Sequence, residues 1–232
     1  MFRNMQFLKD TFQLFFPKIC VCCDVLLMKN ESQICLKCRF DLPITNFTNE
    51  IDNKVEQAFY GRIKIEFATA LLFYRTKGIT QKLVYQLKYK GQQDIGVLLG
   101  EWLGFELKES ERFPSIDYII PVPLHAKKLK KRGYNQLSTF GMSISKILKV
   151  PYIDTVLIKK SVTETQTLKR RFERWKNVNE IFHLLDTIIF QNKHVLLIDD
   201  VITTGATLEA CTLQLSKTTG IKISIATMAF TE

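Results

Sequence analysis

Two adjacent carboxylates stand between an apolar run and a polar turn in the last part of the chain. Asp199 and Asp200 follow the run 194–198, and the turn after them holds Thr203, Thr204, Gly205, Ala206 and Thr207. Backbone N–H groups and hydroxyls at such a helix start suit a phosphate group. Adjacent carboxylates suit the vicinal hydroxyls of a sugar, directly or through a hydrated divalent cation. The segment therefore predicts a site for a ribose that carries a 5-phosphate.

Cysteines form a second chemical feature. Five of the six fall close together, at Cys20, Cys22, Cys23, Cys35 and Cys38. Taking Cys20 with Cys23 and Cys35 with Cys38 gives two C-x2-C pairs, each of which lets one tight turn present both sulfurs to a tetrahedral Zn²⁺. The pairs predict a structural zinc site, with Cys22 as an alternative ligand in place of Cys20 or Cys23. Buried thiols without a metal are the other interpretation.

Alternating apolar runs and helical patterns must position these groups. Strands are expected in the runs 68–74, 116–122, 194–198 and 222–230, with a weaker run at 153–158. Apolar residues at helical spacing recur in 79–87 and 137–148, and a less regular helix follows the polar turn. Strand runs without alternation, separated by helices, predict an α/β fold with a parallel sheet covered on both faces. Such sheets bind ligands at the carboxyl ends of their strands, where the acids and the turn lie.

The first residues have the pattern of an amphipathic helix. Its apolar face consists of Phe2, Met5, Leu8, Phe12, Phe15 and Phe16. Lys9 and Asp10 interrupt the apolar residues, which argues against a signal peptide, and no stretch of the chain approaches a transmembrane segment. We expect a cytoplasmic protein whose N-terminal helix packs on the rest of the chain. A peripheral position at the inner face of the membrane is the alternative.

Composition and charge set the remaining limits. The 232 residues are 46% hydrophobic and 24% charged, which excludes long disorder, collagen-like and coiled-coil classes. We divide the chain into an amphipathic helix at 1–18, a zinc-binding module at 19–45 and an α/β domain at 58–232, with a polar linker at 41–57. The net charge of +10 indicates an anionic partner, which could be nucleic acid, an acidic membrane or a phosphorylated small molecule.

The acidic segment, V-L-L-I-D-D-V-I-T-T-G-A-T at 195–207, resembles the phosphoribosyl pyrophosphate (PRPP) binding motif of type I phosphoribosyltransferases. Together with the cysteine pairs, it resembles the ComF family of competence-associated, amidophosphoribosyltransferase-like proteins. Three further stretches extend this resemblance over nearly the whole chain: LKYKG at 87–91, IPVPLHAKKLKKRGYNQ at 120–136 and TETQTLKRRFERWKNVNEIF at 163–182. The CVCC cluster and Tyr134 depart mildly from the family pattern.

The resemblance implies a type I phosphoribosyltransferase-like parallel sheet flanked by helices, with a small N-terminal zinc module that has four cysteine ligands. It implies that Asp199 and Asp200 hold the ribose hydroxyls, with Mg²⁺ as part of the bound PRPP, and that the 203–207 turn holds the 5-phosphate. The segment Pro123, Leu124 and His125 would approach pyrophosphate. Residues 163–178 resemble a hood loop, in which Arg171 and Arg174 would contact phosphate, with Lys169 and Arg170 behind them.

Several of these residues have structural interpretations too. The cations within 127–132 suit the solvated face of a short helix, and His125 suits a hydrogen-bonded loop position. His183, His194 and Cys211 are expected to be structural. Thr203 and Thr204 also suit a helix cap.

Three hypotheses for function follow. The first is a phosphoribosyltransferase that binds PRPP and Mg²⁺, with an acceptor that the sequence does not identify, associated with DNA uptake as ComF relatives are. The second is a non-catalytic protein that binds single-stranded DNA during transformation through basic loops and aromatic residues. The third is an adaptor that docks on the DNA-uptake helicase or channel.

Overall fold

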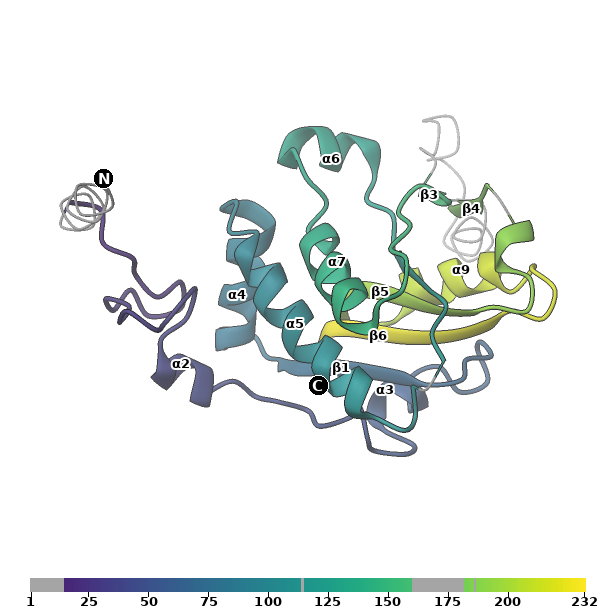
Figure 1. Cartoon of the computed structure of the whole chain (residues 1–232), viewed down its shortest axis with the longest axis horizontal. Coiled ribbons are helices and arrows are strands. Elements are labelled where there is room, and N and C mark those ends of the chain that lie inside the picture. The colour runs from purple at the N-terminus through teal and green to yellow at the C-terminus, as the bar shows by residue number, and fades with distance from the viewer. Residues whose placement is uncertain (1–14, 114, 160–181, 186) are drawn as a thin grey trace, which may run out of the picture.

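A parallel sheet lies at the centre of the computed structural model, which describes residues 15–113, 115–159, 182–185 and 187–232 (Figure 1). Its strand order is β1-β6-β5-β2. The strands are β1 (Ala68–Tyr74), β2 (Tyr118–Pro121), β5 (His194–Ile202) and β6 (Lys222–Thr231). Every neighbouring pair is parallel, as the uninterrupted apolar runs predict.

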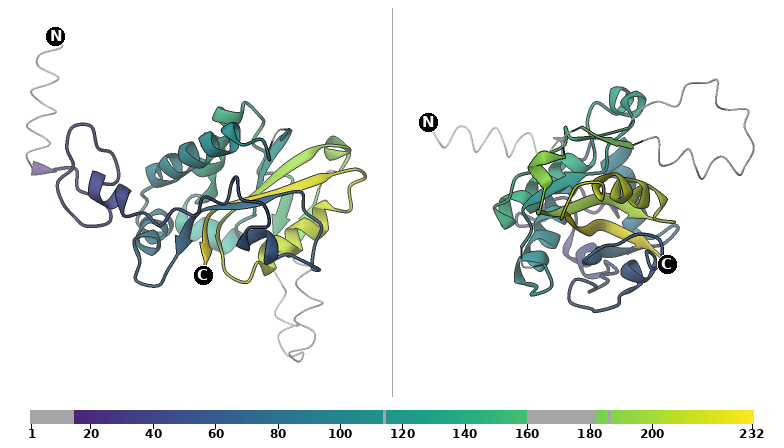
Figure 2. Two further views of the ribbon diagram at one scale, coloured as in Figure 1. Left: turned by 90° about the horizontal axis from the view of Figure 1, so that it is seen from below. Right: turned by 90° about the vertical axis from the view of Figure 1, so that its right-hand side faces the viewer.

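Helices cover both faces of the sheet and bury its central strands. Helices α4 (Ile79–Tyr89), α5 (Asp94–Glu109) and α7 (Leu137–Leu148) lie on one face, and α9 (Ala206–Leu215) lies on the other (Figure 2). Residues 195–198 of β5 are fully buried between these layers. Burial on both faces explains why this strand has no polar alternation.

Helices α5 and α7 pack unusually closely because α5 presents glycine at every fourth position. Gly96, Gly100 and Gly104 face α7, and a Cβ atom built at Gly100 would overlap the carbonyl oxygen of Phe140. The glycine stripe therefore lets the two backbones approach each other. This packing holds α7, and the residues just before it, against the sheet.

The strand that carries the acidic residues is longer than predicted. The sequence pattern predicted that the strand ends at residue 198. Strand β5 instead continues to Ile202, because its pairing with β6 continues as far as the pair of Ile202 with Phe230. Asp199 and Asp200 consequently lie within the strand, with Asp199 opposite Thr227 of β6. Their carboxyl groups are held by a paired strand, which is a more rigid support than the loop that the sequence indicated.

The segment 41–57, expected as a linker, is built onto the outer edge of β1. Ile44 forms an antiparallel bridge with Leu72, and the Asn53 amide donates a hydrogen bond of 2.9 Å to the carbonyl oxygen of Ala68. The short helix α3 (Lys54–Gln57) follows Asn53, whose side chain caps it. This segment therefore covers the edge of the sheet.

The remaining elements are short. Helix α6 (Ala126–Arg132) follows β2, and β3 (Leu157–Lys159) pairs antiparallel with β4 (Phe182–Leu184), before the 3-10 turn η2 (Ile188–Phe190). The weaker strand expected at 153–158 is thus shifted to 157–159. Helix α2 (Leu36–Phe40) belongs to the cysteine-rich part.

Two predicted segments lie largely or wholly outside the described residues. The structure describes only 15–18 of the amphipathic helix at 1–18, and it does not describe Arg171 and Arg174 of the hood segment. Among the helices that the structure does describe, none has the length and apolar character needed to span a bilayer.

Candidate functional site

The carboxyl group of Asp200 is held by two side chains from the helical layer. It accepts a hydrogen bond of 2.6 Å from the Gln136 amide, and the ammonium group of Lys88 lies 2.8 Å from its other oxygen. Both charged side chains are largely buried, with 20% of Lys88 and 10% of Asp200 exposed. Two close partners offset the cost of burying this carboxyl group, so Lys88 and Gln136 fix its position.

Asp199 differs from its neighbour in its surroundings. It is half-buried, and its Oδ1 accepts a hydrogen bond of 2.8 Å from the Asp200 backbone N–H. Burial raises the pKa of the Asp199 carboxyl, and the negative charge of Asp200 raises it further. A cation bound between the two carboxylates would remove this repulsion, so the acid pair suits a positively charged or hydroxyl-rich ligand.

The 203–207 turn leads directly from β5 into α9. Gly205 has a φ of +73°, and a Cβ at this position would come 2.8 Å from Cε1 of Phe59. Arg62 supports the turn from outside, because it donates to the Thr204 carbonyl at 3.0 Å and forms an ion pair with Glu209. The four other residues of the turn are exposed. The Thr204 hydroxyl accepts a hydrogen bond of 3.4 Å from the Ala206 N–H, in agreement with a helix cap. The turn therefore places exposed residues on a fixed backbone at the start of α9.

A cavity of about 380 Å³ lies beside the acid pair, and we call it the cationic cavity. It brings together predicted residues from distant segments: Pro123, Leu124, His125, Asp199, Asp200 and Thr207. Lys88, Lys128, Arg132 and Lys159 also line it. Burial lowers the pKa of Lys159, and the nearby charge of Lys128 lowers it further. The second effect arises because the two cations lie close together.

His125 has a structural position at the edge of this cavity. Its Nδ1 accepts a hydrogen bond of 3.1 Å from the Lys127 N–H, which makes His125 the N-cap of α6. None of the α6 residues is buried, in agreement with a solvated basic face. The capping contact occupies one ring nitrogen, so the structure favours the structural interpretation of His125.

Four contributors to the site were missed as functional residues from the sequence: Arg62, Lys88, Gln136 and Lys159. Lys88 lies within LKYKG and Gln136 ends IPVPLHAKKLKKRGYNQ, so the motifs contained them without indicating their roles. Only the folded chain brings them to Asp200. Arg62 and Lys159 lie outside every motif that we considered.

The cysteine-rich part forms a second candidate site. The sulfur atoms of Cys20, Cys23, Cys35 and Cys38 all lie within 4.8 Å of one another, and the Cys23 and Cys35 sulfurs are 3.7 Å apart. Four sulfurs at about 2.3 Å from a tetrahedral zinc ion would lie about 3.8 Å apart, so the cluster has suitable dimensions for a metal. Cys22 lies outside this cluster. We call residues 19–45, which contain the cluster, the Cys module.

The other candidate side chains have structural roles, as predicted. His194 is buried and its Nε2 lies 2.9 Å from the Ser224 hydroxyl. Burial lowers the pKa of His194. Cys211 is fully buried in α9, and burial raises the pKa of its thiol. A buried neutral thiol is a packing group rather than a nucleophile.

Comparison with known proteins covers the part of this site that β5 and the 203–207 turn contribute. Residues 138–231 match the phosphoribosyl transferase domain family. Competence protein F of Haemophilus influenzae is 30% identical over 139 residues, or 58% of this chain and 61% of that protein. DNA utilization protein YhgH of Escherichia coli O157:H7 is 29% identical over 128 residues, or 54% of this chain and 56% of that protein. The match therefore spans about three fifths of the length of these relatives.

Two solved structures are also similar to the chain. Glutamine PRPP amidotransferase from B. subtilis is 16% identical, with a TM-score of 0.42, over 61% of this chain and 30% of that one. Adenine phosphoribosyltransferase from Leishmania tarentolae is 14% identical, with a TM-score of 0.38, over 78% of this chain and 89% of that one. From the family match and the curated relatives, residues 138–231 carry a phosphoribosyl transferase domain and the chain is similar to Competence protein F, in agreement with the resemblance in its motifs.

Proposed function

We propose that this protein binds PRPP together with Mg²⁺ and transfers its phosphoribosyl group to an acceptor. The observation that carries the proposal is the position of the acid pair. Asp199 and Asp200 lie near the carboxyl end of β5, between an exposed, rigid turn and a cavity lined by four cations. Sugar, 5-phosphate and pyrophosphate each have a chemically suitable partner within one edge of the sheet.

Each part of PRPP is assigned to residues that suit its chemistry. Asp199 and Asp200 would hold the ribose hydroxyls and the substrate-bound Mg²⁺, since carboxylate oxygens are preferred ligands of that ion. The turn from Thr203 to Thr207 would hold the 5-phosphate at the start of α9. The segment Pro123, Leu124 and His125 would face the pyrophosphate, whose negative charge matches the cationic cavity.

Transfer breaks the bond between the anomeric carbon and a pyrophosphate oxygen and forms a bond from that carbon to the acceptor, which loses a proton. Positive charge develops on the sugar and negative charge on the departing pyrophosphate. Lys88, Lys128, Arg132 and Lys159 lie where they would stabilise the leaving group. We assign Arg171 and Arg174 of the hood segment the same task, and include them with Asp199 and Asp200 among the catalytic residues.

The ion pair of Lys88 with Asp200 would compete with a ligand for the same carboxyl group. Gln136 contacts one oxygen of Asp200 and Lys88 the other, which leaves fewer lone pairs for a ligand. Pyrophosphate in the cationic cavity would offer the Lys88 ammonium group a new anionic partner. Lys88 would then exchange a carboxylate for a phosphate and release Asp200 for the ribose.

The Cys module is proposed to hold a structural Zn²⁺ through Cys20, Cys23, Cys35 and Cys38. Backbone N–H groups of Cys35 and Cys38 donate to the sulfurs of Cys20 and Cys35 at 3.4 Å, a contact that favours thiolates. A metal bound by four thiolates has no open coordination position and would stabilise the fold of the module. We keep 1–18, 19–45 and 58–232 as the proposed organisation of the chain.

The names of the relatives suggest the process that this chemistry serves. Competence protein F and DNA utilization protein YhgH are named for competence and DNA utilization. We propose that this protein acts in DNA uptake in the cytoplasm, with a peripheral position at the membrane as the alternative. The exposed cations of α6 favour one other function, a non-catalytic protein that binds single-stranded DNA or docks on the DNA-uptake helicase.

Release of pyrophosphate from PRPP separates these functions. The full chain with Mg²⁺ is expected to release pyrophosphate when a suitable nucleophile is present, and Asp199→Asn is expected to abolish release. If PRPP binds but no tested nucleophile releases pyrophosphate, the protein is a binding protein. DNA affinity that falls steeply with salt, in a protein that does not bind PRPP, would support the DNA-binding alternative.

A further inference from the structure

The 203–207 turn is supported by the segment 58–62, which lies between α3 and β1. Phe59 is fully buried and lies against Gly205, where a Cβ atom built on the glycine would come 2.8 Å from Cε1 of the ring. The guanidinium carbon of Arg62 lies 5.8 Å from the centre of the same ring. The segment 58–62 therefore forms a base for the turn and for the start of α9.

Arg62 connects this base to both ends of the turn region. Its Nη1 donates hydrogen bonds to the carbonyl oxygens of Ala58, at 2.9 Å, and Thr204, at 3.0 Å. Its Nε donates to the Glu209 carboxylate at 3.1 Å, and its Nη2 forms an ion pair with the same oxygen. One N–H on Nε, two on Nη1 and one on Nη2 thus have acceptors within the protein, out of the five that an arginine carries.

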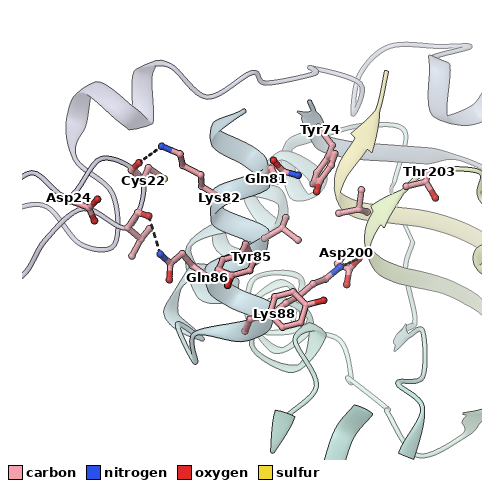
Figure 3. A pocket seen from close by; sticks show the side chains of 14 residues that line it. Cys22, Asp24, Tyr74, Gln81, Lys82, Tyr85, Gln86, Lys88, Asp200 and Thr203 are labelled. Carbon is pink, nitrogen blue, oxygen red and sulfur yellow. Dashed lines mark hydrogen bonds and ion pairs between the residues drawn. The ribbon is translucent and has the colours of Figure 1, made fainter. Parts of the chain in front are cut away.

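The two cavities at the end of β5 do not include Arg62. Asp200 and Thr203 line a cavity of about 730 Å³ together with α4, and Figure 3 shows the Lys88 side chain reaching Asp200 there. Thr207 lines the cationic cavity. Arg62 lines neither of these two cavities. It can therefore influence a ligand at this end of the sheet through the turn and Glu209, which it contacts directly.

The first influence acts on the backbone of the turn. In a planar trans peptide, the N–H of Gly205 points away from the carbonyl oxygen of Thr204. The hydrogen bond from Arg62 holds that oxygen on the side of the base, so it fixes the direction of the Gly205 N–H at the start of α9. Free N–H groups at a helix start are the donors that a phosphate uses.

The second influence acts on charge. Glu209 lies in the first turn of α9, at the end of the helix whose partial positive charge attracts anions. Its carboxylate and the turn contact the same guanidinium group, so a phosphate at the turn would lie within about one Debye length, roughly 8–10 Å, of this negative charge. Unpaired, Glu209 would repel the phosphate. The charge of Arg62 offsets this repulsion.

We propose that Arg62 and Glu209 are positioning residues that set the affinity of the 203–207 turn for a sugar phosphate. This proposal deepens the proposed function and rests on it, because it needs the 5-phosphate at the turn. Arg62 orients the backbone and cancels the charge of Glu209, and Glu209 limits how strongly the helix start attracts phosphate. Pyrophosphate would not respond to the pair, because neither residue lines the cationic cavity.

Calorimetry with two anions tests the pair, each titrated into the full chain with Mg²⁺. Ribose 5-phosphate reports on the turn, and pyrophosphate reports on the cationic cavity. Arg62→Met is expected to weaken ribose 5-phosphate binding about tenfold and to leave pyrophosphate binding unchanged. Arg75→Met is the matched control, because it breaks an exposed ion pair of 2.8 Å with Glu232 and should bind both anions as wild type does.

Substitution of Glu209 separates the effect of charge from a loss of structure. Glu209→Gln removes the negative charge and leaves Arg62 in place, so it should tighten ribose 5-phosphate binding about threefold. The double variant of Arg62→Met with Glu209→Gln should regain most of the affinity that Arg62→Met loses. Thermal unfolding establishes that each variant is folded, and Glu209→Gln tests the effect of charge by itself if Arg62→Met does not fold.

The outcomes distinguish the two proposals. Wild-type protein that does not bind PRPP would overturn the proposed function, and the role of the pair with it. Wild-type protein that binds PRPP but not ribose 5-phosphate would overturn the role of the pair alone. The same conclusion would follow if Arg62→Met bound ribose 5-phosphate equally well or lost both anions alike, or if Glu209→Gln failed to tighten ribose 5-phosphate binding.

Discussion

Lys88 of α4 and Asp200 of β5 form an ion pair of 2.8 Å in the wall of the cationic cavity. Gln136 holds the other oxygen of the same carboxylate at 2.6 Å. The pair therefore connects the helical layer to the strand that carries the acids. We propose that the ion pair rearranges when PRPP binds.

Replacement of Lys88 by Met would leave Asp200 with a buried charge and one fewer partner. We expect Lys88→Met to lower the free energy of unfolding by about 3 kcal/mol, and the double variant with Asp200→Asn to recover most of this loss. Urea denaturation measures both. Lys54→Met breaks an exposed ion pair with Glu232 and should cost less than about 1 kcal/mol. Equal losses in the two single variants would contradict the assigned role of Lys88.

The raised pKa of Asp199 predicts how stability varies with pH. In the folded protein this carboxyl keeps its proton above the ordinary value of 3.8, so the folded state binds more protons than the unfolded state in that range. Stability is therefore expected to fall as the pH rises from about 4 through the raised pKa. Asp199→Asn should remove this fall, as measured by thermal unfolding across pH. A variant with the same pH profile as wild type would show that Asp199 titrates normally.

The same shift predicts the pH dependence of binding. Mg²⁺ and PRPP would favour the ionised form of Asp199, so affinity should rise with pH, and binding should release protons. Calorimetry in buffers of different ionisation enthalpy measures the number of protons released. Proton uptake, or affinity that falls with pH, would argue against a ligand at Asp199.

Gly205 combines a left-handed backbone with a close neighbour. Gly205→Ala should cost about 1 kcal/mol for the positive φ and about 1–3 kcal/mol more for overlap with Phe59. Gly61→Ala is the matched control, because Gly61 has a φ of +68° and no atom within 4 Å of a built Cβ. Only Gly205→Ala is expected to weaken PRPP binding as well. Similar losses in both variants would mean that contact with Phe59 does not constrain the turn.

The cysteine cluster predicts which cysteine substitutions remove the bound metal and which leave it in place. We expect one zinc ion per chain by elemental analysis, loss of that metal in Cys38→Ser, and full retention in Cys22→Ser and Cys211→Ser. Removal of the metal with a chelator should lower the thermal unfolding temperature. If Cys22→Ser loses the metal and Cys23→Ser retains it, Cys22 is the ligand in place of Cys23.

Sequence patterns located the main elements well where the signal was local. The run 68–74 coincides with β1, and the two C-x2-C pairs coincide with the sulfur cluster. The predicted end of β5 was wrong, because pairing with β6 extends the strand through two acidic residues of a type that disfavours strands. The partners of Asp200 could not be predicted, because Lys88 and Gln136 reach it only after α4 and α7 pack on the sheet.

The most direct test of the central claim is the affinity of the acid pair for PRPP. Calorimetry with the full chain and Mg²⁺ is expected to show saturable binding of PRPP, and Asp199→Asn should weaken it at least about tenfold, or about 1.4 kcal/mol. Asp154→Asn, which changes an exposed acid outside the cavities around Asp200, should bind as wild type does. PRPP that fails to bind wild type, or that binds Asp199→Asn equally well, would contradict the account.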